Sequence, residues 1–107
     1  MRAALIEQAR AGVPVTYAEL AARLALRPPH TIHRLALALE RLMEEDAQAG
    51  RPLLAALVVS RTRSGRPAPG FFEAAHRLGA FPGDPADETA FAFHGEALRR
   101  AIAYYGG

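Results

Sequence analysis

The chain has 107 residues, half of them hydrophobic, and its 13 basic and 11 acidic residues give a formal net charge of +2. It contains no cysteine, which excludes disulfides, thiolate nucleophiles and cysteine-bearing zinc sites, and no segment reaches the roughly 18 apolar residues of a membrane span. We therefore expect residues 1–107 to form a single domain of a cytoplasmic protein that has no signal peptide and no membrane partner.

The first predicted element is a helix over residues 2–11. Gly12 is well placed to end this helix in a left-handed conformation. Pro14 prevents the helix from resuming at once, so residues 13–15 are expected to form a short extended link.

Residues 16–50 have the pattern of a helix-turn-helix. Thr16 and Glu19 have the spacing of a capping box, which predicts that a helix begins there. Pro28 and Pro29 end that helix because a residue before proline avoids the helical conformation, so a second helix begins near Pro29. The apolar positions expected to face the core are Tyr17, Leu20, Ala21 and Leu24 in the first helix, and Ile32, Leu35, Ala36, Leu39, Leu42 and Met43 in the second.

A winged helix is predicted from the segment that follows. Residues 53–60 form an apolar run with β-branched residues at its end, which favours a buried strand. Residues 61–66 are rich in arginine and contain the turn-forming pair Ser64-Gly65, and the prolines after them allow only a short return strand at a sheet edge. The predicted fold class is therefore α+β and mostly helical, a winged helix-turn-helix with additional C-terminal helices.

Two further helices are predicted near the C-terminus. Gly70 opens a short helix over residues 71–79, and helical spacing resumes over residues 91–105 after a turn-rich loop. The apolar face of the last helix, together with Tyr104 and Tyr105, offers a surface for a homodimer or a protein partner.

The arginines gather in the predicted helix-turn-helix and hairpin. Residues 1–42 carry six arginines and three acids, residues 51–66 carry four arginines and no acid, and residues 43–50 carry three acids and no base. This polarised distribution suits double-stranded DNA, with the acidic end facing away from phosphate; the alternative is a set of free arginines on a solvated surface. The predicted DNA-binding residues are Thr16, Tyr17, Arg27, His30, Thr31, His33, Arg34, Arg61, Arg63 and Arg66, the hairpin arginines contacting phosphate and the helix start reading a groove.

The sequence shows no recognisable set of catalytic residues. His30 and His33 could share a helix face, but no third metal ligand is evident near them in the sequence. No phosphate-binding loop, dinucleotide-binding fingerprint or hydrolase motif occurs. We therefore predict no catalytic residue, no metal site and no cofactor.

The segment Pro14-Val-Thr-Tyr-Ala-Glu-Leu-Ala21, the later segment Leu35-Ala-Leu-Ala-Leu39 and the predicted strand and hairpin resemble the winged-helix DNA-binding domain of alkylguanine-DNA alkyltransferases and alkyltransferase-like proteins. The resemblance covers about residues 13–70. It implies a second helix that enters the minor groove, with an arginine near its start that replaces a flipped nucleotide; this chain has His33 there, followed by Arg34. The family's Pro-Cys-His-Arg motif would fall within residues 54–59, where this chain has only Ala, Leu and Val, so alkyl transfer is excluded.

Three hypotheses follow. The leading one is a non-enzymatic winged-helix protein that binds double-stranded DNA, as a regulator or a DNA-associated factor. The second is a protein–protein interaction or dimerisation module on the same scaffold. The third is a lesion sensor similar to alkyltransferase-like proteins, which would prefer alkylated duplexes.

Overall fold

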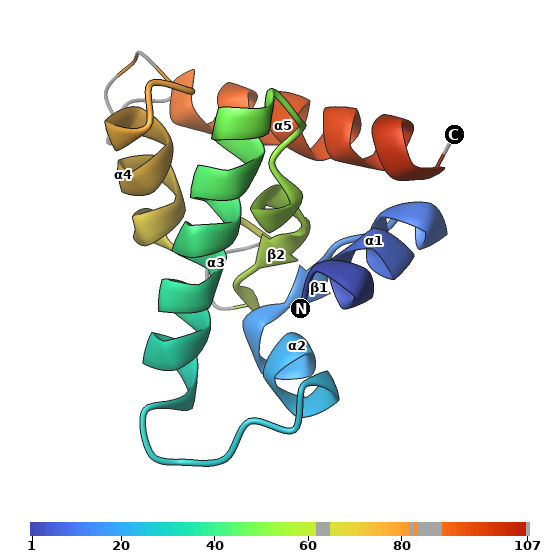
Figure 1. The fold of residues 1–107 in the computed structure, drawn as a ribbon, viewed down its shortest axis with the longest axis vertical. Helices are drawn as coiled ribbons and strands as arrows, with labels where there is room; N and C mark the ends of the chain where they lie inside the picture. The colour runs from blue at the N-terminus through green and yellow to red at the C-terminus, as the bar shows by residue number, and fades with distance from the viewer. Residues whose placement is uncertain (62–64, 82, 84–88, 107) are drawn as a thin grey trace.

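The computed structural model describes residues 1–61, 65–81, 83 and 89–106, and within them the chain is mostly helical with one pair of short parallel strands (Figure 1). The α+β, mostly helical class is thus confirmed. In chain order the elements are α1 (Arg2–Ala11), β1 (Val15–Thr16), α2 (Tyr17–Arg23), α3 (Thr31–Ala49), the 3-10 helix η1 (Leu54–Leu57), β2 (Val58–Val59), α4 (Pro69–Arg77) and α5 (Thr89–Gly106).

Helix α3 forms the central column of the molecule. In Figure 1, α4 lies on one side of α3, α5 crosses behind its C-terminal end, and α1 and α2 lie on the other side. The first turns of α3 extend beyond α4, so that part of the helix has a face that no other helix covers. No helix in the described part of the chain is long and apolar enough to cross a membrane.

The predicted helix ends of the first half of the chain are confirmed. Gly12 has the predicted left-handed conformation that ends a helix, with a φ value of 77°, and Gly50 ends α3 in the same way with a φ value of 69°. Thr16 and Glu19 form the predicted capping box: the Thr16 hydroxyl accepts the Glu19 N–H at 3.1 Å, and the Glu19 carboxylate accepts the Thr16 N–H at 3.2 Å. Helix α3 begins at Thr31 instead of near Pro29.

The strand predicted over residues 53–60 is mostly wrong. The first part of this run forms η1, and only Val58–Val59 is a strand, which pairs in parallel with Val15–Thr16. The run is apolar on every side, so it is buried as readily in a 3-10 turn as in a strand and its periodicity does not distinguish them.

The described residues of the predicted hairpin are those at its base. Ser60 donates its N–H to the Arg66 carbonyl at 2.7 Å in an isolated antiparallel bridge, and Gly65 has the left-handed conformation of a turn residue. Arg63 and Ser64 lie outside the described residues. The described part of the hairpin therefore contains a bridge and no extended return strand, so the predicted winged helix is not confirmed.

The core is built around η1. All four of its residues are buried, and helices α1, α3 and α5 all pack against it. On α3, Leu35, Leu39, Leu42 and Met43 are buried as predicted. Ile32 was also expected in the core, but it is 51% exposed because none of the described elements covers the first turn of α3 on that side.

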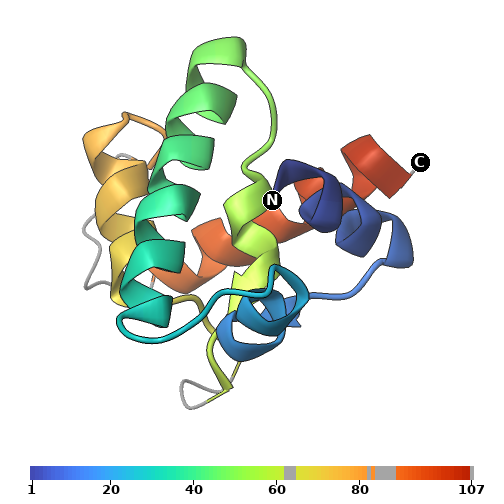
Figure 2. The same ribbon diagram turned by 60° about the horizontal axis from the view of Figure 1, so that its bottom comes forward.

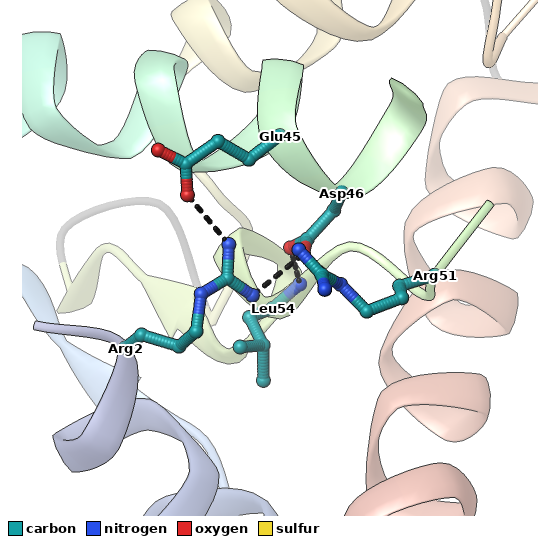
Figure 3. A network of polar contacts seen from close by, with 5 residues as sticks. All are labelled: Arg2, Glu45, Asp46, Arg51 and Leu54. Carbon is teal, nitrogen blue, oxygen red and sulfur yellow. Dashed lines mark hydrogen bonds and ion pairs between the residues drawn. The ribbon is translucent and has the colours of Figure 1, made fainter. Parts of the chain in front are cut away.

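A buried carboxylate joins three parts of the chain near the C-terminal end of α3 (Figure 3). Asp46 is completely buried; it accepts hydrogen bonds from Arg2 at 2.7 Å, from Arg51 at 3.2 Å and from the Leu54 N–H at 3.2 Å. Burial lowers the pKa of the Arg2 guanidinium, but its hydrogen bonds to Asp46 and Glu45 outweigh that effect and raise the pKa above its usual value. The acids at this end of α3 thus have a structural function that the sequence did not reveal.

The C-terminal helices close the core from the side opposite α2. Phe71 and Phe72 are buried, and both rings lie edge-on to the imidazole of His94. Nε2 of His94 donates a hydrogen bond to the Ala56 carbonyl at 2.9 Å, because a carbonyl can only accept. Burial holds the pKa of His94 below its usual value despite this bond, which favours the neutral imidazole near pH 7.

Candidate nucleic-acid interface

The turn between α2 and α3 presents four of the predicted residues to solvent. The side chains of Arg27, His30, His33 and Arg34 are exposed, whereas Thr31 is half-buried. Arg34 donates from Nη2 to the Arg27 carbonyl at 3.2 Å, which holds its guanidinium beside the turn. The helix start is therefore accessible, as DNA recognition would require.

An open groove of about 380 Å³ runs between α2, α3 and the base of the hairpin. In Figure 2, α2, the start of α3 and the base of the hairpin lie together in the lower part of the view. Most of the groove surface is apolar, and Arg61 is the charged residue on it. Its lining residues are Thr16, Tyr17, Ala18, Ile32, Ala36, Ser60, Arg61 and Ala68.

Two of the predicted DNA-binding residues have structural contacts of their own. Thr16 caps α2, and the Tyr17 hydroxyl accepts the N–H of Ala68 at 3.1 Å. This bond ties the start of α2 to the segment that leaves the hairpin. Thr16 and Tyr17 therefore help to hold the walls of the groove in place.

The two described hairpin arginines lie on different sides of the hairpin. Arg61 lines the groove with Tyr17 and Ile32. Arg66 instead stacks over the Phe91 ring of α5, with its guanidinium carbon 3.8 Å from the ring centroid. Only Arg61 therefore shares a surface with the start of α3.

Most of the described arginines without a carboxylate partner lie around α3; the other two are Arg10, which donates to the Tyr105 carbonyl, and Arg66, which stacks on Phe91. Within the described residues, Arg2, Arg23, Arg51, Arg77 and Arg99 form ion pairs shorter than 3.5 Å. No such pair is formed by the exposed arginines of the α2–α3 turn, the outer face of α3 and the hairpin base, which are Arg27, Arg34, Arg41 and Arg61.

One acid lies close to this cationic group. The pKa of Glu19 is lowered by its hydrogen bonds with the side chain and backbone of Thr16, and to a smaller extent by the positive charge of Arg61. Arg61 is therefore partly screened by Glu19. Arg34 has no acidic residue within four positions of it along the chain, whereas Arg41, two turns further along α3, is followed one turn later by Glu44 and Glu45.

Sequence reasoning missed three residues at this surface. Arg41 lies seven residues after Arg34, so the helical repeat places both on one side of α3, and this spacing could have identified it. Leu37 is 50% exposed between them, and Ile32 was assigned to the core. In the part of the chain that the structure describes, no three histidine, aspartate or glutamate side chains are grouped to hold a metal ion.

A comparison of the chain with family models, curated proteins and solved structures gives no significant match. The geometry of this surface is therefore the basis of the functional assignment.

Proposed function

We propose that this chain is a non-enzymatic DNA-binding protein of the winged-helix type that docks on duplex DNA through the first three turns of α3 and the base of the hairpin. The observation that supports this most strongly is the clustering of Arg27, Arg34, Arg41 and Arg61, none of which forms a close ion pair among the described residues. Arginines that the fold does not neutralise are available for phosphate oxygens.

The distribution of the paired charges supports the same orientation. Glu44, Glu45 and Asp46 lie at the far end of α3, and two of them are held by Arg2. A duplex beside the first three turns of α3 would therefore meet the cationic end of the helix and avoid the acidic one. Arg34 and Arg41 are separated by about 10.5 Å along the helix axis, a span that allows contacts with different phosphates.

The test is the salt dependence of duplex binding, measured by fluorescence anisotropy on a short labelled duplex. Arg34→Ala and Arg41→Ala should each weaken binding and reduce the slope of log affinity against log salt by about 0.9. Arg77→Ala and Arg99→Ala are matched controls, because these arginines are exposed but lie on α4 and α5 in ion pairs. Undetectable binding at low salt, or equal losses in the controls, would overturn the proposal.

A second candidate is self-association through α5, and one observation favours it. Tyr104 is 60% exposed beside an open groove of about 510 Å³, which is also lined by Arg51, Pro52 and Arg100. Tyr105, in contrast, is half-buried against the core and is less available to a partner. An antiparallel two-fold pairing of α5 centred on residue 98 would place Glu96 opposite the other copy's Arg100, and an isologous interface repeats this contact on both sides of the axis.

Sedimentation velocity tests this second candidate. Glu96→Arg alone and Arg100→Glu alone should each dissociate the dimer, and the double variant should restore it because the charges are exchanged. A monomer at all concentrations would exclude this interface. A lesion sensor remains a third proposal; it would bind an alkylated duplex more tightly than the plain one.

A further inference from the structure

Two aliphatic side chains interrupt the polar surface at the start of α3. Ile32 and Leu37 are 51% and 50% exposed, although burying either aliphatic side chain would stabilise the fold. Leu37 is five positions after Ile32, so the two side chains lie about 140° apart around the helix. Ile32 borders the groove on the hairpin side, and Leu37 lies between Arg34 and Arg41.

The neighbours of these residues restrict what they can contact. Leu37 lines a hollow of about 320 Å³ whose other residues are Arg34, Ala38 and Arg41. The groove beside Ile32 has mainly apolar walls with Arg61 at its edge. An occupant must therefore offer small apolar groups surrounded by negative charge.

Duplex DNA offers this combination in its major groove. The C5 methyl of thymine is an apolar group on the groove floor, and phosphates line both edges. An α-helix with its side chains is about 10–12 Å across, which matches the major-groove width of about 12 Å and exceeds the minor-groove width of about 6 Å. An anionic membrane surface would favour one continuous apolar face, whereas here His33 and Arg34 separate the two aliphatic residues.

We propose that Ile32 and Leu37 contact thymine methyl groups in the major groove, so that the protein prefers duplexes containing thymine. This inference rests on the proposed DNA-binding function. In this arrangement Arg34 and Arg41 hold the phosphates on either side of Leu37, and Arg61 approaches the backbone beside Ile32. Phosphate contacts supply affinity, and the two aliphatic contacts supply base preference.

The experiment compares two duplexes that differ only in methyl groups. Anisotropy titrations at one salt concentration use a short duplex of A·T pairs and the same duplex with deoxyuridine in place of thymidine. The wild-type protein should bind the thymine duplex more tightly, by about fourfold for each methyl contacted. Ile32→Ala and Leu37→Ala should each reduce this ratio, and the double variant should bring it near one.

Val13→Ala is the matched control, because Val13 is equally exposed but lies in the link before β1. It should keep the wild-type ratio, and circular dichroism should show that all variants are folded. Salt-dependent binding with equal affinity for both duplexes would overturn the thymine inference and leave DNA binding intact. A ratio unchanged in the double variant would also overturn it, since the preference would then come from duplex shape.

Two other outcomes separate the inference from its premise. Failure to bind either duplex at low salt would refute the proposed function itself. Binding to vesicles of anionic lipid that is lost in Leu37→Ala, without any thymine preference, would assign the two aliphatic residues to a membrane surface and overturn the inference.

Discussion

Replacing Asp46 by Asn should destabilise the fold by about 3 kcal/mol. The amide keeps the shape of the carboxylate, so almost no cavity forms, but one acceptor oxygen becomes an NH2 group that faces N–H donors. Breaking a buried ion pair costs about 3–5 kcal/mol because the remaining charge is left without its partner. The lower end applies here because Arg2 keeps its contact with Glu45 and the Arg51 side chain is 38% exposed.

The measurement is urea unfolding followed by far-ultraviolet circular dichroism near pH 7, together with a thermal melt. A loss of about 3 kcal/mol should lower the melting temperature by about 12 °C or more in a chain of this size. Glu45→Gln is the control: its carboxylate contacts the same Arg2 at 2.8 Å, but its side chain is 62% exposed, so the loss should stay under about 1 kcal/mol. Equal losses in the two variants would show that burial does not determine the strength of this network.

Three further predictions concern the fold. The free energy of unfolding should fall as the pH drops below about 6.5, by at most about 1.4 kcal/mol per pH unit from His94, because the folded pKa of His94 is lowered and the unfolded chain binds the proton first. In urea titrations at pH 7.5 and 5.5, the difference in unfolding free energy between the two pH values should be smaller for His94→Gln than for the wild type. An identical difference in both proteins would contradict this role of His94. Thr16→Ala should lower the free energy of unfolding by about 1 kcal/mol, and it should raise the pKa of Glu19 toward its usual value in a carboxyl-detected NMR titration. An unchanged pKa of Glu19 would argue against the capping box. Tyr17→Phe should cost about 1–2 kcal/mol in the same urea assay because the Ala68 N–H loses its acceptor, and an unchanged midpoint would mean that water replaces the hydroxyl.

Local chemistry made much of the helical architecture predictable. The capping box at Thr16 and the glycines at 12 and 50 mark helix ends by rules that act within a few residues, and the structure follows them. The segment 54–57 was not predictable in this way, since its apolar residues fit several conformations and the choice depends on packing against α1, α3 and α5. The strand β2 that follows this segment pairs with a strand 43 residues earlier in the chain, where Val15 lies opposite Val58.

The candidate interface was predictable only in part. The basic character of the α2–α3 turn is visible in the sequence, but which arginines are neutralised depends on contacts between distant elements. Asp46 illustrates this, because its partner Arg2 lies 44 residues away and no local rule connects them. The exposure of Ile32 was also not predictable from the sequence, since its position continues the apolar stripe of α3. Ile32 lies in solvent because none of the described elements covers it.

The central position of η1 determines how the chain tolerates being cut. A break in the exposed link between Gly50 and Arg51 would leave α1 and α3 in one piece and η1 with α5 in the other, each with an uncovered apolar surface. Neither piece should fold alone, yet the two should reassemble when mixed, because the Leu54 N–H would still find Asp46 across the cut. We therefore expect the segment from α2 to α3 to need η1 and α5 in order to fold, so that it should not be stable when it is expressed by itself.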